Sequence, residues 1–132
     1  MRFFGVLCKD FGDDYTMSRA IIQSDLSIRV ADSFLSRLIG WIGKKKIEPN
    51  EALIIIPCNR IHTIGMNASI DAIFVGADNL PIHVIPNLAP GKMPPAVKGA
   101  KYVIEMKAGS SNLYGISVGR PLPAAIIQTI SP

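Results

Sequence analysis

The stretch from Pro57 to Val75, PCNRIHTIGMNASIDAIFV, constrains the fold more than any other part of the sequence. An apolar run, EALIII, leads into this stretch, and a second run, IDAIFV, ends it. Short apolar runs bounded by Gly, Pro, Asn and Ser are typical of buried β-strands. The polar segment between the two runs contains one of the two cysteines and one of the two histidines of the chain. We therefore expect two core strands, with any chemistry concentrated between them.

Size and composition predict one domain with a substantial core. The chain has 132 residues, of which 48% are hydrophobic and only 18% are charged. A chain of this length can bury a real core as a single unit. The longest apolar runs are only a few residues, whereas a membrane-spanning helix needs about 20. We therefore expect no transmembrane segment.

The charge of the chain is moderately basic, with a formal net charge of +4 and one lysine run at Lys44–Lys46. Nucleic-acid-binding domains usually add clustered Arg and Lys interleaved with aromatic residues, or a recognisable motif. Neither feature is present, so we expect no nucleic-acid partner. The lysine run is instead typical of a solvated basic loop.

The cysteines and the N-terminal residues indicate a cytoplasmic protein. Cys8 and Cys58 lie far apart in different surroundings, which is neither a zinc pattern nor a disulfide framework. The early apolar segment FFGVL is too short for the core of a signal peptide. We therefore expect reduced thiols and no bound cofactor, with translation starting at Met1 or at Met17. Residues 1–19 read as a flexible tail and residues 20–132 as a single β-rich domain.

Periodicity predicts one helix among short strands. Phe34, Leu38 and Trp41 recur at helical spacing over residues 33–42, and Gly40 and Gly43 end that pattern. A helical turn is expected at residues 110–114 and a proline-rich surface loop at residues 86–95. Strands are expected at residues 26–31, 51–57, 70–75, 80–85, 101–106 and within 122–130, with alternation clearest at 26–31 and 101–106.

These elements predict a mainly β fold, because short strands and frequent turns alternate without a regular strand–helix–strand rhythm. We expect a small jelly-roll-like sandwich or barrel with one short helix after the first strands. The residues expected to be mostly buried are apolar and come from several elements: Phe34, Leu38, Trp41, Ile55, Ile70, Phe74, Val103 and Ile104.

The polar cluster supports several interpretations. Cys58, His62 and Met66 are spaced four residues apart, and soft ligands of this kind suit Cu(I) or zinc. On a straight strand such neighbours lie about 13 Å apart, so a metal site requires a bend between them. A buried cysteine beside a hydrogen-bonded histidine is the simpler structural alternative. A Cys58 nucleophile activated by His62 is a third reading.

Asp71 is the other notable polar residue, because it interrupts the apolar run IDAIFV. A carboxylate in a buried strand must be paired or hydrogen-bonded, since desolvating a lone charge is costly. Its candidate partners are Arg37, Arg60 and His62. We expect Arg37 and Asp71 to form one buried or half-buried polar network, directly or through His62.

Three motifs resemble those of domain-of-unknown-function family 192 (DUF192). They are V-A-D-S-x-L-S-R-L-x-G-x-x-G at residues 30–43, P-C-N-x-I-H-T-x-x-M-x-x-x-I-D-x-x-F-V at residues 57–75, and A-x-Y-V-I-E-M-x-A-G at residues 100–109. The resemblance covers residues 27–122. It implies a small, single-domain, mainly β fold, and no catalytic activity or cofactor is established for the family. The chain departs from the family pattern at Arg120, where many members have aspartate, and it lacks a second cysteine near Pro94.

The resemblance also defines a candidate set of ligand-binding residues. Five of them belong to the family motifs, and Cys58 joins them from the polar cluster: Arg37, Cys58, His62, Met66, Asp71 and Glu105. The favoured function is a non-enzymatic ligand-binding or accessory protein whose partner is a small molecule or a protein. The alternatives are a soft-metal (copper or zinc) or thiol-dependent protein centred on Cys58 and His62, and a small hydrolase.

Overall fold

The structure is a computed structural model that describes residues 25–131, with the side chains of Phe34, Leu35 and Leu38 excepted. The predicted tail at residues 1–19 and the predicted burial of Phe34 and Leu38 lie outside that description. Eight elements follow one another along the described chain: β2 (Ser27–Ala31), α2 (Phe34–Ile39), β3 (Glu51–Ile55), β4 (Ile70–Val75), β5 (Pro81–Leu88), β6 (Tyr102–Lys107), α3 (Ser110–Leu113) and α4 (Ala124–Ile130).

The strands form one open, mixed sheet in the order β2-β3-β6-β4-β5. The β2–β3 pair is parallel, and the other three pairs are antiparallel. Parallel neighbours need a crossover connection, and here α2 lies in that connection. The prediction of a mainly β fold is confirmed, but the prediction of a sandwich or barrel is wrong. Within residues 25–131 no second sheet covers the first, and β2 and β5 remain its two edges.

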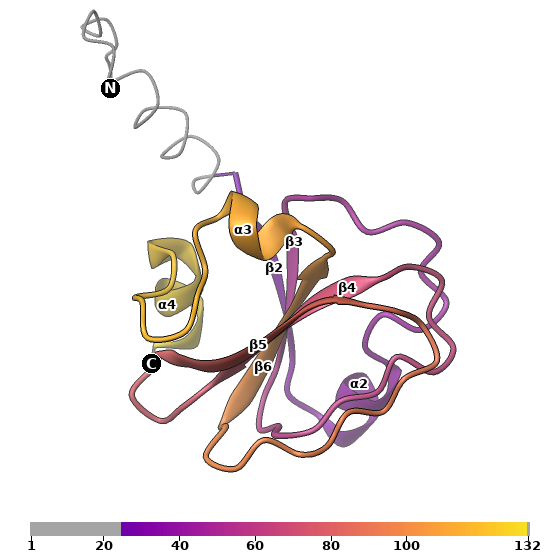
Figure 1. Ribbon diagram of the computed structural model, residues 1–132, viewed down its shortest axis with the longest axis horizontal. Helices are drawn as coiled ribbons and strands as arrows, with labels where there is room; N and C mark the ends of the chain where they lie inside the picture. Colours follow the sequence, from indigo (N-terminus) through magenta and orange to yellow (C-terminus); the bar gives the residue numbers. More distant parts are fainter. Residues whose placement is uncertain (1–24, 132) are drawn as a thin grey trace, which may run out of the picture.

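Helices and loops cover both faces of the sheet. In Figure 1, α3 and α4 lie on one side, and α2 with the long loops lies on the other. Each side has its own apolar core: Ile73, Ile104 and Ile126 belong to the core under α3 and α4. Trp41 and Phe74 belong to the core on the α2 side. The sheet is thus the middle of three layers.

Strand β6 runs through the centre of the sheet, and its side chains alternate as the sequence predicts. Tyr102, Ile104 and Met106 pack in the core beneath α3 and α4. Val103 packs in the opposite core, and Glu105 follows it two positions along the strand. The alternation of β6 therefore directs Glu105 toward the α2 side of the sheet.

Six of the predicted core residues are confirmed as buried, namely Trp41, Ile55, Ile70, Phe74, Val103 and Ile104. The predicted helix is also confirmed, although it is shorter than residues 33–42. Ser33 caps α2 through a reciprocal pair of bonds with Ser36, and Gly40 ends it with a φ of 49°, which favours glycine.

Two predicted elements are wrong. Residues 124–130, expected as strand, form helix α4, because Ile126 and Ile130 lie one turn apart and pack on the same core as Leu122. Residues 86–88, expected as loop, continue β5 to Leu88. Pro86 is tolerated there because β5 is an edge strand.

The helices of the described chain are short. The longest, α4, has seven residues. Within residues 25–131 no helix combines the length and the apolar character that crossing a bilayer requires.

Candidate functional site

A cavity of about 340 Å³ lies on the α2 side of the sheet. Its walls come from the end of α2, from the loop that follows β3, and from the strands beneath. The lining side chains are mostly apolar, with a few polar and charged groups among them: Arg37, Ile39, Gly40, Trp41, Ile42, Ile55, Pro57, Cys58, Asn59, Arg60, Ile61, His62, Met66 and Glu105. This size and mixed lining are typical of small-molecule sites.

Glu105 is the buried carboxyl group of the cavity. Only 3% of the residue is exposed. No hydrogen bond or ion pair joins its carboxyl group to any other part of the chain that the structure describes. Burial raises the pKa of Glu105 to about 8, since desolvation penalises the charged form. At neutral pH the group is therefore mostly a neutral carboxylic acid, which can donate a hydrogen bond as well as accept one.

Arg37 reaches the same cavity from α2. Its side chain is half-buried, and its Nη1 donates to the carbonyl oxygen of Asp32 at 3.0 Å. A guanidinium has five N–H donors, so this one bond leaves most of them available. Arg37, Cys58 and Glu105 all line this one cavity.

Cys58 presents a neutral thiol rather than a reactive thiolate. Its Sγ donates to the carbonyl oxygen of Arg60 at 3.0 Å. Burial raises the pKa of the Cys58 thiol. The smaller effects of the Arg60 backbone bond and of Arg37 lower this pKa, whereas Glu105 raises it further. Because the thiolate is the nucleophilic form, this environment does not activate Cys58.

His62 and Met66 line the same cavity as Cys58, so the three residues that are spaced four apart in the sequence lie at one site. The backbone N–H of Ile64 donates to Nδ1 of His62 at 3.2 Å. A neutral His62 therefore carries its proton on Nε2. Met66 is 8% exposed and also belongs to the α2-side core. Residues 25–131 contain no group of three or more His, Cys, Asp or Glu side chains that could hold a metal ion.

Asp71 lies on the other side of the sheet, and the predicted network with Arg37 is wrong. Asp71 is fully buried, and its Oδ1 accepts from the N–H of Asn87 at 2.9 Å. Its Oδ2 accepts from the N–H of Gly109 at 3.0 Å. The same oxygen accepts from the N–H of Ser111 at 3.0 Å and from the Ser111 hydroxyl at 2.7 Å. These four bonds tie β4 to β5 and to the start of α3, so Asp71 is a structural residue.

Trp41 forms a wall of the cavity, although the sequence indicated only a core residue. Among the described residues, its Nε1 is the one fully enclosed side-chain polar atom without a hydrogen-bond partner. Arg29 and Lys44 flank the ring, with the Arg29 Cζ at 5.2 Å and the Lys44 Nζ at 5.4 Å from its centroid. Contacts at these distances fall within the range of cation–π attraction.

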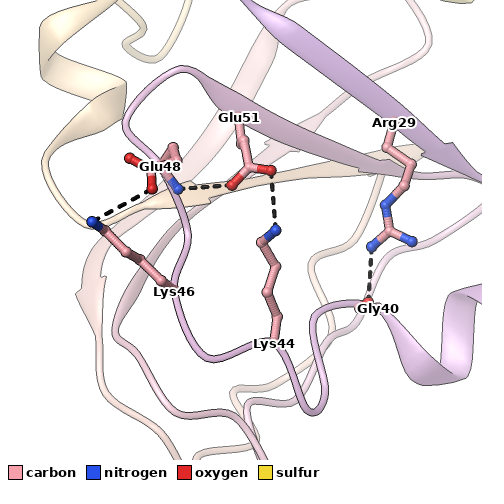
Figure 2. A network of polar contacts seen from close by, with 6 residues as sticks. All are labelled: Arg29, Gly40, Lys44, Lys46, Glu48 and Glu51. Carbon is pink, nitrogen blue, oxygen red and sulfur yellow. Dashed lines mark hydrogen bonds and ion pairs between the residues drawn. The ribbon is translucent and has the colours of Figure 1, made fainter.

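The contacts in Figure 2 hold the segment around Trp41 against the sheet edge. Arg29 on β2 donates to the carbonyl oxygen of Gly40 at 3.0 Å. Lys44 pairs with Glu51 at 3.1 Å, and Glu51 also accepts from the N–H of Glu48 at 2.8 Å. These bonds anchor both sides of the turn that carries Trp41, and they position the cavity wall.

Thr63 anchors the loop that carries Cys58 and His62, a role that the sequence reasoning missed. Thr63 is fully buried, and its Oγ1 donates to the Ala89 carbonyl oxygen at 2.7 Å. The same Oγ1 accepts from the N–H of Lys92 at 2.8 Å. The loop that contains Ala89 and Lys92 is therefore hydrogen-bonded to the loop that carries Cys58 and His62. The T in the motif P-C-N-x-I-H-T was a signal for this role, but spacing alone did not reveal the partner loop.

Two solved structures share this fold. One is a protein of unknown function from Novosphingobium aromaticivorans DSM 12444, with a TM-score of 0.65 and 21% identity over 71% of this chain and 71% of that chain. The other is a candidate transcription regulator from Sinorhizobium meliloti 1021, with a TM-score of 0.65 and 18% identity over 71% of this chain and 78% of that chain. At these identities the likeness shows the fold alone.

The comparison with curated proteins found no significant match. The comparison with family models found one that matches residues 17–124, described as an uncharacterized ACR and called DUF192. The matched region includes the cavity residues and the Asp71 network, and it spans most of the chain. The protein therefore belongs to the DUF192 family.

Proposed function

We propose that this protein is a non-enzymatic small-molecule-binding domain and that its ligand occupies the cavity between α2, the loop after β3 and the sheet. One observation carries the proposal: Glu105 is only 3% exposed and lines the cavity, and its carboxyl group has no hydrogen-bond partner among the described residues. Burying an unpartnered polar group costs free energy, so such a group needs an explanation. A ligand that bonds to Glu105 supplies one.

The surroundings of Glu105 support binding more than catalysis. The Cys58 thiol bonds to a carbonyl oxygen rather than to His62, and burial raises its pKa. A thiol nucleophile needs the opposite arrangement, with a base in contact and a lowered pKa. The hydrolase alternative therefore lacks an activated nucleophile at this cavity.

The soft-metal alternative has weaker support than ligand binding. Cys58, His62 and Met66 do line one cavity. However, the Cys58 thiol donates a hydrogen bond to the Arg60 carbonyl oxygen, and Nδ1 of His62 accepts one from the Ile64 N–H. Both atoms would have to give up these bonds to bind a metal ion. Metal content measured after purification without a histidine tag tests this alternative: stoichiometric copper or zinc that is lost in Cys58→Ser would replace the present proposal.

A compound screen tests the proposed function directly. Trp41 is the only tryptophan of the chain and forms a cavity wall, so its fluorescence reports occupancy of the cavity. A ligand should change that fluorescence and raise the melting temperature together, because binding to the folded state alone stabilises it.

Two matched variants assign a binding signal to the cavity. Ile39 lines the cavity and is 46% exposed, whereas Ile82 lies on β5 and is 38% exposed. Ile39→Gln should weaken the binding of a ligand found in the screen, and Ile82→Gln should leave it unchanged. Equal effects of the two variants, or no compound that shifts both signals, would refute the proposed function.

A further inference from the structure

Among the described residues that line the cavity, positively charged groups outnumber carboxyl groups. Arg37 and Arg60 line it, and each brings a guanidinium cation. Within the described part of the chain, Glu105 is the only carboxyl group in the lining. Even with Glu105 ionised, the two guanidinium groups leave an excess of positive charge. The electrostatics of the lining therefore favour an anionic ligand over a cationic one.

The hydrogen-bonding groups point to the same conclusion. Arg37 uses one N–H on Asp32 and keeps the others available. Glu105 in its neutral form offers an O–H donor and has no protein partner within residues 25–131. The acceptor nitrogen of His62, Nδ1, is already occupied by the Ile64 N–H. A ligand that brings acceptor oxygens thus matches these groups better than one that brings only donors.

The apolar lining and the volume of the cavity indicate the size and polarity of the rest of the ligand. Trp41, Ile55 and Ile61 are apolar or aromatic and buried, and they surround the polar groups. A volume of about 340 Å³ lies near the lower end of the range that is typical of small-molecule sites. The ligand is therefore small, with one polar end and a short apolar body.

On the basis of the proposed function, we propose that the ligand is a small monocarboxylate. Its carboxylate lies between the guanidinium of Arg37 and the protonated carboxyl group of Glu105, and its apolar body lies against Trp41. The proton of Glu105 is shared in an O–H···O bond with the ligand, and Arg37 supplies the opposite charge. Carboxylate–guanidinium pairs of this kind form strong, directional contacts.

This arrangement gives binding a defined pH dependence. The titratable and charged groups that line the cavity with Glu105 are Arg37 from α2 and Cys58, Arg60 and His62 from the loop, while the neighbouring strands place Leu53 and Ala72 beside it. As pH rises through the titration of Glu105, an ionised carboxylate repels the anionic ligand. Affinity should therefore fall between about pH 6 and about pH 9.

The test compares three probes of equal chain length: hexanoate, hexanol and hexylamine. At about pH 6, titration calorimetry of the full chain should show hexanoate binding about ten-fold or more tightly than the other two, since a charged hydrogen bond is worth at least that factor. Glu105→Gln keeps a hydrogen-bond donor but cannot ionise. It should retain hexanoate binding and remove the decline toward pH 9.

Two arginine variants complete the test. Arg37→Met should weaken hexanoate binding about ten-fold or more, whereas Arg120→Met changes an exposed arginine outside the cavity and should have no effect. Tighter binding of hexylamine or hexanol would overturn the carboxylate inference while leaving a ligand-binding cavity. The absence of hexanoate binding at millimolar concentration would overturn it as well. The proposed function itself is tested separately, by the compound screen and by the Ile39→Gln and Ile82→Gln variants.

Discussion

Asp71 and Glu105 are buried carboxyl residues on adjacent strands, and they point to opposite faces of one sheet. In the β4–β6 register, Asp71 lies opposite Met106 and Ala72 lies opposite Glu105. Asp71 accepts four hydrogen bonds from Asn87, Gly109 and Ser111. Glu105 has none among the described residues and lines the cavity. One carboxyl group thus holds the fold together, and the other is available to a ligand.

The Asp71 network should be essential for stability. Asp71→Ala leaves the N–H groups of Gly109 and Ser111 without their acceptor in a buried region. We expect the free energy of unfolding in urea to fall by about 3–5 kcal/mol. Asp32→Ala, at an exposed position, serves as the control and should change it by less than about 0.5 kcal/mol. Similar small losses in both variants would show that the network contributes little.

Thr63 should stabilise the cavity loop through its hydroxyl group. Thr63→Val keeps the shape of the side chain but removes the bonds to Ala89 and Lys92. The free energy of unfolding should fall by about 1–3 kcal/mol, because two part-buried hydrogen bonds to the backbone are lost. In Thr129→Val the lost hydroxyl bond is exposed on α4, so stability should barely change. An equal loss in both variants would contradict the assigned role.

Cys58 should react slowly with alkylating reagents near neutral pH. Burial raises the pKa of its thiol, so the reactive thiolate is scarce. In a Cys8→Ser background, iodoacetamide should modify the folded protein more slowly than the same chain unfolded in urea. A faster reaction in the folded state would indicate an activated thiolate and would favour a thiol-dependent function of Cys58 instead.

Glu105 should make folding less favourable as pH rises. Its pKa in the folded protein is about 8, whereas its ordinary value is 4.5. Between these values the unfolded chain releases a proton that the folded chain retains, so stability declines with rising pH. The decline approaches about 1.4 kcal/mol per pH unit and ends above about pH 8. Urea unfolding of the wild type and of Glu105→Gln, measured at several pH values, should show this decline only in the wild type.

The sequence predicts the face of Glu105 but not that of Asp71. In β6 the alternation of Tyr102, Ile104 and Met106 with Val103 and Glu105 can be read directly from the residue order. Strand β4 is buried on both faces. Its apolar run therefore shows no alternation, and nothing local indicates which face Asp71 occupies. The proposed Arg37–Asp71 network failed for this reason.

The cavity itself was only partly predictable. The motif residues Arg37, His62 and Glu105 come from three separate segments, and the fold does bring them to one site. The residue spacing could not reveal that Trp41 lines the cavity, because a tryptophan on the apolar face of a helix is usually a core residue. The support that Thr63 gives through Lys92 depends on a contact between two loops. Loop contacts of this kind leave no periodic signal in the sequence.

The most direct test of this account is an NMR titration of the Glu105 side-chain carboxyl carbon, assigned by comparison with Glu105→Gln. We expect a midpoint near pH 8, because the group is buried and lacks a partner among the described residues. Saturating hexanoate should move the midpoint upward, because a bound anion favours the protonated form of Glu105. A midpoint below about pH 5 would contradict the account, because it would mean that Glu105 is ionised and already satisfied by the protein.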